Sequence, residues 1–142
     1  MTAALNETAR RARILIVDDE ANNRLLLEVM LANDGYEVVT ASAGSEALEL
    51  VEQLPPDLIV LDVMMPGMDG YQVAARIKTN PATRHIPIII LTALGDRNSM
   101  MHGLNAGAEE FLTKPVVRAE LSLRVRNLLR LTEPGSSGAV EA

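Results

Sequence analysis

Cysteine and tryptophan are absent from this 142-residue sequence, which also has only one phenylalanine and two tyrosines. The lack of cysteine excludes disulfides and metal sites built from thiolates. The scarcity of aromatic rings argues against single-stranded nucleic-acid binding by base stacking. The net charge of −6 argues against general attraction to phosphate backbones. We therefore expect an aliphatic core and no direct nucleic-acid binding.

Long hydrophobic runs are absent as well. No apolar stretch approaches the length of about 20 residues that a membrane-spanning helix needs, and the N-terminus lacks the apolar centre of a signal peptide. We therefore expect a cytoplasmic protein without a membrane partner. The length suits one domain with one substantial core. We expect a flexible lead-in over residues 1–11, a folded domain over residues 12–131, and a flexible tail over residues 132–142, where Pro, Gly and Ser gather.

Strand and helix patterns alternate five times within the folded part. Short aliphatic runs typical of buried strands occupy residues 13–17, 37–41, 58–61, 87–92 and 109–113. Helical patterns occupy residues 22–34, 45–53, 71–78, 98–105 and 118–131. The first helical pattern carries an apolar face made of Leu25, Leu26, Val29 and Met30. This alternation predicts an α/β fold, a doubly wound parallel sheet with helices on both faces.

Polar side chains stand at the C-terminal ends of four of these strands. They are Asp18 and Asp19, Asp62, Thr92 and Lys114, at the ends of the first, third, fourth and fifth strands. Taken singly, each is an ordinary turn, strand-end or surface residue. Because parallel strands emerge at the same edge of a sheet, we expect the three carboxylates to crowd together. Such crowding is relieved by a hard cation such as Mg²⁺, so the sequence predicts a site that handles phosphoryl groups.

Four segments carry a resemblance to a known family: residues 16–19 (IVDD), 61–70 (LDVMMPGMDG), 91–93 (LTA) and 114–115 (KP). They resemble the receiver domain of bacterial two-component response regulators, and the resemblance covers residues 12–131. The chain is similar to single-domain receivers and to receivers that precede diguanylate cyclase modules. The resemblance implies a flavodoxin-like sheet of five parallel strands in the order 2-1-3-4-5, with five helices.

The resemblance also implies the chemistry of the site. Asp62 would be the phosphoacceptor, taking a phosphoryl group from a histidine kinase, a phosphotransfer protein or a small acyl phosphate. Mg²⁺ would be held by Asp18, Asp19 and Asp62, together with the backbone carbonyl of Met64. Lys114 would pair with the phosphoryl oxygens as a point charge.

Further residues would transmit the signal or shape the site. By resemblance, Thr92 moves to the phosphoryl group, and Phe111 swings inward to report the change by packing alone. The residues that shape the loops would be Pro66, Gly67, Gly70, Ala93 and Pro115, the last after a cis peptide bond. The surface that switches would comprise the fourth helix, the fifth strand and the fifth helix.

A homodimer formed on phosphorylation is an additional hypothesis. It rests on the arginines of the last helical pattern, which could pair with Glu109 or Glu110 of a second copy. These arginines are Arg118, Arg124, Arg126 and Arg130.

Two other classes of function share parts of this pattern. A Mg²⁺-dependent phosphatase with an aspartyl-phosphate nucleophile usually has a second aspartate two residues after the nucleophile, where this chain has Met64. A nucleotide- or flavin-binding domain needs a glycine-rich loop after the first strand, but residues 18–22 place negative charge there. We therefore expect no enzyme activity beyond phosphorylation and dephosphorylation of the chain itself.

The extent of the whole protein has two readings. The chain is either a complete single-domain regulator or the receiver of a longer kinase or cyclase. We favour the complete regulator, because the sequence starts with Met1 and its tail does not break off inside a patterned element.

Overall fold

The computed structural model describes residues 11–93 and 106–132, in which five strands form a single parallel sheet. The strand order is β2-β1-β3-β4-β5, and every neighbouring pair is parallel. This order confirms the predicted fold, and the strand bounds differ from the prediction by at most one residue. The strands are β1 (Arg13–Val17), β2 (Glu37–Ala41), β3 (Leu58–Asp62), β4 (Ile88–Thr92) and β5 (Glu110–Thr113).

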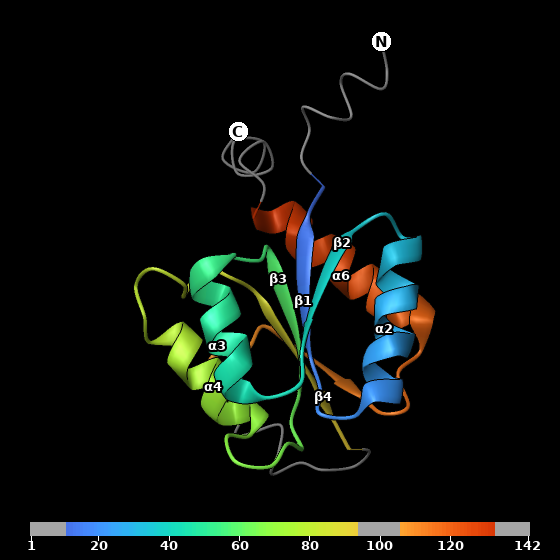
Figure 1. Cartoon of the computed structure of the whole chain (residues 1–142). Coiled ribbons are helices and arrows are strands. Elements are labelled where there is room, and N and C mark those ends of the chain that lie inside the picture. Colours follow the sequence, from blue (N-terminus) through green and yellow to red (C-terminus); the bar gives the residue numbers. More distant parts are fainter. Residues whose placement is uncertain (1–10, 94–105, 133–142) are drawn as a thin grey trace, which may run out of the picture.

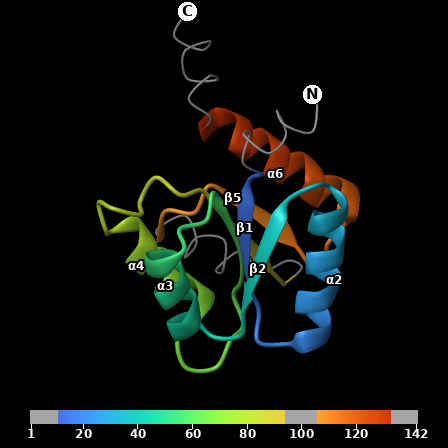
Figure 2. The same ribbon diagram turned by 45° about the horizontal axis from the view of Figure 1, so that its top comes forward.

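Four helices flank the sheet, with α3 and α4 on one face and α2 and α6 on the other (Figures 1 and 2). They are α2 (Ala21–Asn33), α3 (Gly44–Gln53), α4 (Gly70–Lys78) and α6 (Arg118–Thr132). The predicted helix over residues 98–105 lies outside the described residues, as do the predicted lead-in and tail apart from Arg11 and Thr132. No helix of the described part combines the length and apolar character needed to cross a membrane.

The core consists of two aliphatic layers, one on each face of the sheet. β3 and β4 are buried at every position, because a parallel sheet that is covered on both faces has no solvent side. Successive residues of a strand enter opposite layers: Leu15 packs with α3 and α4, whereas Ile14 and Ile16 pack with α2 and α6. The predicted aliphatic core is present, and it holds the strand ends in fixed register.

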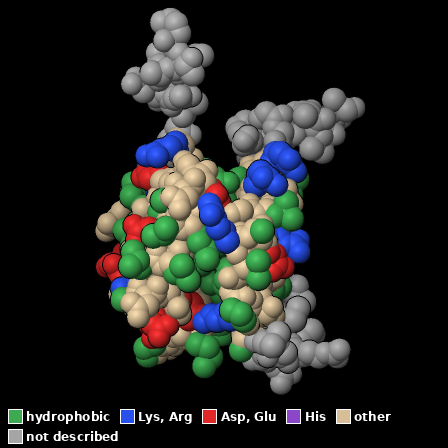
Figure 3. All heavy atoms as spheres, turned by 90° about the vertical axis from the view of Figure 1, so that its right-hand side faces the viewer, with side chains coloured by type: hydrophobic (Ala, Val, Ile, Leu, Met, Phe, Trp, Pro, Cys, Tyr) green, Lys and Arg blue, Asp and Glu red, His purple; other side chains and the backbone are tan. Residues whose placement is uncertain are grey.

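The buried face of α2 differs from the predicted one. Leu27 and Leu31 are buried, whereas Leu25, Leu26 and Val29 are 60%, 56% and 48% exposed. Three consecutive leucines allow more than one apolar face on this helix, and packing against the sheet selects the face with Leu27 and Leu31. The predicted apolar face of Leu25, Leu26, Val29 and Met30 is therefore not the buried one, and of these four residues only Met30 packs against the core, where it is partly buried. Figure 3, which views the side of the molecule with α2, shows apolar side chains exposed among charged ones.

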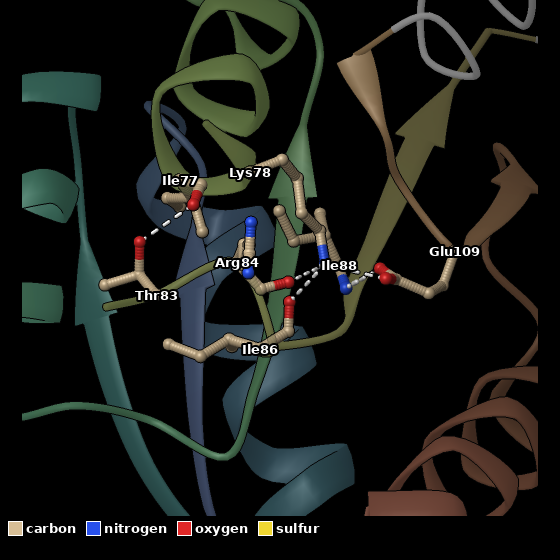
Figure 4. A network of polar contacts seen from close by, with 7 residues as sticks. All are labelled: Ile77, Lys78, Thr83, Arg84, Ile86, Ile88 and Glu109. Atoms are coloured by element: carbon tan, nitrogen blue, oxygen red, sulfur yellow. Dashed lines mark hydrogen bonds and ion pairs between the residues drawn. The ribbon is translucent and has the colours of Figure 1, made fainter. Parts of the chain in front are cut away.

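A polar clamp ties the end of the sheet opposite the acidic residues (Figure 4). The Lys78 ammonium donates to the carbonyls of Arg84 and Ile86 at 3.0 and 2.7 Å, and to Oε2 of Glu109 at 2.6 Å. Oε1 of Glu109 accepts from the backbone N–H of Ile88 at 2.8 Å. The Lys78 side chain is only 11% exposed, whereas that of Glu109 is 37% exposed. These contacts join α4 to the segments that lead into β4 and β5.

We expect Lys78→Met to lower the free energy of unfolding by about 2 kcal/mol, because it removes three hydrogen bonds made by one charged donor. Urea denaturation measures the change. Arg118→Met is the matched control, since its pair with Asp34 is long, at 3.4 Å, and the Arg118 side chain is 55% exposed. The control should shift stability by less than about 0.5 kcal/mol. Equal shifts in the two variants would contradict a special role for the clamp.

Candidate functional site

Three carboxylates meet at the C-terminal edge of the sheet. In the register of β1 and β3, Val17 lies opposite Leu61, so the residues that follow them, Asp18 and Asp62, lie side by side. One oxygen each from Asp18, Asp19 and Asp62 lies within 4.8 Å of the others. Asp18 and Asp62 are buried, at 1% and 2% exposed, whereas Asp19 is exposed. The crowding expected from the sequence is therefore present.

Two more polar residues complete this edge: Thr92 at the end of β4, and Lys114 directly after β5. The Lys114 ammonium forms an ion pair with Oδ1 of Asp62. The backbone N–H of Lys114 donates to the Thr92 carbonyl at 2.8 Å, which holds the two residues together. Thr92 is 1% exposed, and its hydroxyl has no hydrogen-bond partner. The structure thus brings a cation and a free buried hydroxyl to the same edge as the acids.

Electrostatic repulsion remains in this arrangement. Burial raises the pKa of the Asp62 carboxyl, and the charges of Asp18 and Asp19 raise it further. The hydrogen bond and charge of Lys114 act in the opposite direction but do not cancel the rise. A second cation among the three carboxylates would favour the ionised form of Asp62.

The donor set fits a hard divalent cation. All three candidate side-chain ligands are carboxylates, which suit Mg²⁺ far better than soft metals. Oδ2 of Asp18 is buried without a hydrogen-bond partner, an arrangement that is costly unless a cation or water satisfies it. The thioether of Met64 is too soft a ligand for Mg²⁺, so only the Met64 backbone carbonyl is a candidate ligand. These residues are therefore suited to hold Mg²⁺.

The loop that follows Asp62 depends on two glycines. Gly67 has a φ of +75°, a conformation that L side chains rarely adopt. A Cβ on Gly70 would collide with the backbone carbonyl of Asp62 and would lie 2.9 Å from Cα of Val63. Gly70 thus lets the start of α4 approach the backbone of Asp62 closely. Pro66, directly before Gly67, is exposed.

The remaining predicted residues lie around the same edge. The peptide bond between Lys114 and Pro115 is cis, as the resemblance implied. Ala93 directly follows Thr92 and is exposed. Phe111 lies on β5 opposite Ile90 and is half-buried against the layer of α3 and α4.

Sequence reasoning missed two sets of contacts. Arg24 in α2 donates from Nη1 to the backbone carbonyl of Asp18 at 2.8 Å, a contact signalled only by an arginine soon after the acidic pair. The acids invoked for a dimer also have partners within the chain. Glu109 pairs with Lys78 at 2.6 Å, and Glu110 lies 3.7 Å from Arg124.

Comparison with known sequences supports this picture. The family model described as the response regulator receiver domain matches residues 14–126. Response regulator PleD of Caulobacter vibrioides is 50% identical over 119 residues, covering 84% of this chain and 26% of that protein. The phosphate regulon transcriptional regulatory protein PhoB of Pseudomonas aeruginosa is 44% identical over 126 residues, covering 89% of this chain and 55% of that protein. The chain thus spans only a quarter to about half of these curated relatives.

Comparison with solved structures gives the same family. The receiver domain of a signal transduction histidine kinase from Syntrophus aciditrophicus has a TM-score of 0.82 at 36% identity, covering 87% of this chain and 93% of that one. The receiver domain of the sensor histidine kinase PA1611 from Pseudomonas aeruginosa, which has magnesium coordinated in its active-site cleft, has a TM-score of 0.78 at 32% identity. That match covers 84% of this chain and 98% of that one. With its sheet order, its clustered acids and these matches, the chain belongs to the response regulator receiver domain family.

Proposed function

We propose that this chain is the phosphoacceptor of a two-component phosphorelay, and that Asp62 accepts a phosphoryl group in a Mg²⁺-dependent reaction. A histidine kinase or a phosphotransfer protein would be the donor. One observation carries the proposal: the buried Asp62 carboxylate pairs with Lys114 and has two further carboxylates within 4.8 Å. Family membership supports the same reading.

The transfer is a direct displacement at phosphorus. An oxygen of Asp62 bonds to phosphorus as the bond from phosphorus to the donor breaks, and the electron pair leaves with the donor nitrogen or oxygen. Asp18, Asp19, Asp62 and the Met64 carbonyl would hold Mg²⁺, which when bound supplies positive charge for the phosphoryl oxygens. Lys114 exchanges its pairing with the Asp62 carboxylate for pairing with a phosphoryl oxygen.

Signal output would begin at the free hydroxyl of Thr92. A phosphoryl group on Asp62 adds acceptor oxygens, and this hydroxyl is buried without a partner beside it. Thr92 lies opposite Thr113 on β5, two residues beyond Phe111. A shift of Thr92 therefore reaches β5, where we propose that Phe111 repacks and changes the surface formed by β5 and α6.

The phosphoacceptor function does not require a homodimer. Within the chain, Glu109 pairs with Lys78, and Glu110 lies near Arg124. A dimer that used these acids would have to break those contacts first. Sedimentation of the phosphorylated chain decides the question, because a dimer would double the mass.

Enzymatic turnover of an external substrate is likewise no part of the proposal. Met64 lies two residues after Asp62 and has no group that could act as an acid or base. We propose that the chemistry of the chain is limited to gaining and losing its own phosphoryl group, in the cytoplasm.

The test is the intact mass of the chain after incubation with acetyl phosphate and Mg²⁺. We expect a gain of one phosphoryl group. The gain should disappear in Asp62→Asn and when a chelator removes Mg²⁺. A folded wild-type chain that gains no mass, or an Asp62→Asn variant that gains the same mass, would refute the proposed function.

A further inference from the structure

Arg24 lies near the start of α2, and the proposed chemistry does not use it. Its guanidinium Nη1 donates to the backbone carbonyl of Asp18 at 2.8 Å. Its own backbone N–H donates to the carbonyl of Glu20 at 3.0 Å, within the first turn of the helix. Arg24 therefore fastens the acidic turn to α2 through both its side chain and its backbone.

The other polar groups of Asp18 show what this contact completes. The backbone N–H of Asp18 donates to the carbonyl of Ala41 at 3.1 Å, and Oδ1 accepts from the N–H of Glu20 at 2.9 Å. With Arg24 on the carbonyl, every polar group of Asp18 except Oδ2 has a partner. Oδ2 is buried without one, so the turn is restrained on all sides but the one where a cation would bind.

The turn has no ordinary helix cap to do this work. Glu20, the N-cap residue of α2, makes no side-chain capping hydrogen bond. A guanidinium-to-carbonyl hydrogen bond is charge-assisted and stronger than a neutral one. Its positive charge also offsets part of the repulsion among the neighbouring carboxylates. Arg24 thus restrains the acidic turn through the Asp18 carbonyl and moderates the charge of the turn.

We infer that Arg24 is a positioning residue for the Mg²⁺-dependent reaction of Asp62, acting through Asp18 and touching no reacting atom. The inference rests on the proposed function. Without the guanidinium, the Asp18 carbonyl loses its partner and the turn gains freedom to rotate the Asp18 carboxylate. Mutation of a group that orients a metal ligand without touching the metal typically lowers metal affinity by about 10- to 100-fold.

The test compares Arg24→Gln and Arg24→Lys with the control Arg76→Met on the full chain. Arg76 lies exposed on α4, and its replacement removes a positive charge without touching the acidic turn. Calorimetric titration with Mg²⁺ alone gives each dissociation constant. We expect Arg24→Gln to bind about tenfold more weakly than wild type. The affinity of Arg24→Lys should lie between those of Arg24→Gln and wild type, because lysine keeps the positive charge and donor groups but not the planar shape of the guanidinium. Arg76→Met should match wild type.

A second readout separates positioning from a merely structural role. The phosphorylation rate of Arg24→Gln with acetyl phosphate should recover as Mg²⁺ is raised, because the reacting groups are unchanged. Loss of thermal stability with an unchanged Mg²⁺ dissociation constant would overturn the inference. If Arg24→Gln fails to fold, Arg24→Lys carries the test, and an affinity equal to that of Arg76→Met would overturn it.

The outcomes distinguish this inference from the proposed function. A wild-type chain that binds Mg²⁺ and gains a phosphoryl group, with Arg24 variants that bind Mg²⁺ equally well, refutes only the role of Arg24. A wild-type chain that neither binds Mg²⁺ nor gains a phosphoryl group refutes both.

Discussion

Asp62→Asn is expected to make the protein more stable at pH 7 by about 1–2 kcal/mol, even though it removes the phosphoacceptor. Asp62 is a buried carboxylate, and burial raises its pKa, with further contributions from the charges of Asp18 and Asp19. Asparagine has nearly the same shape and no charge, so the desolvation and repulsion disappear. Lys114, which loses its partner, has a side chain that is 34% exposed and can turn to water.

The pH dependence of this gain follows from the direction of the pKa shift. The folded state holds the Asp62 proton more tightly than the unfolded state. Wild-type stability therefore falls as pH rises from the ordinary carboxyl pKa through the raised pKa of the folded state. The advantage of asparagine should be absent at acidic pH below both values and complete above the folded value.

Urea denaturation at several pH values, with chelator present, measures the gain. Asp19→Asn serves as the comparison, because Asp19 is exposed and its neutralisation should stabilise the protein less. Adding Mg²⁺ in place of chelator should stabilise wild type more than Asp62→Asn. An Asp62→Asn variant less stable than wild type at pH 7 would contradict this account of the site.

Gly70→Ala is expected to destabilise the protein by about 3 kcal/mol, the upper end of the usual range for overpacking. In an ordinary helix the same change stabilises by about 1 kcal/mol, so the expected sign is reversed. The reason is space, because the added Cβ would collide with the carbonyl of Asp62 and lie 2.9 Å from Cα of Val63. Relief of the collision moves the backbone of Asp62, so the phosphorylation rate should fall by about 100-fold as well.

Gly67→Ala is the control from the same loop. A Cβ on Gly67 would meet no atom within 4 Å, so only the positive φ of +75° opposes alanine there. That strain costs about 1–2 kcal/mol. Denaturation and the rate of mass gain from acetyl phosphate measure both variants. If Gly67→Ala slows the reaction as much as Gly70→Ala, the close approach of Gly70 to Asp62 is not the cause.

The sheet and its functional edge could be predicted from the sequence alone. Each strand is a short aliphatic run, and such runs alternating with helical periodicity allow few arrangements other than a parallel sheet. Asp62 ends one strand of that sheet, and Asp18 and Lys114 directly follow two others. Parallel strands emerge at one edge, so the order of residues along the chain was sufficient to bring these side chains together.

Other features were decided by tertiary structure. The leucine run of α2 fits more than one apolar face, and only contact with the sheet selects Leu27 and Leu31. Lys78 and Glu109 are 31 positions apart, and neither belongs to a motif. The sequence by itself determined the strands, their parallel sheet and the acids at its edge, because periodicity and strand ends are local signals. Tertiary structure alone decided the buried helix face, the clamp at Lys78 and the contact of Arg24 with Asp18, because these depend on packing between segments and leave no periodic trace in the chain.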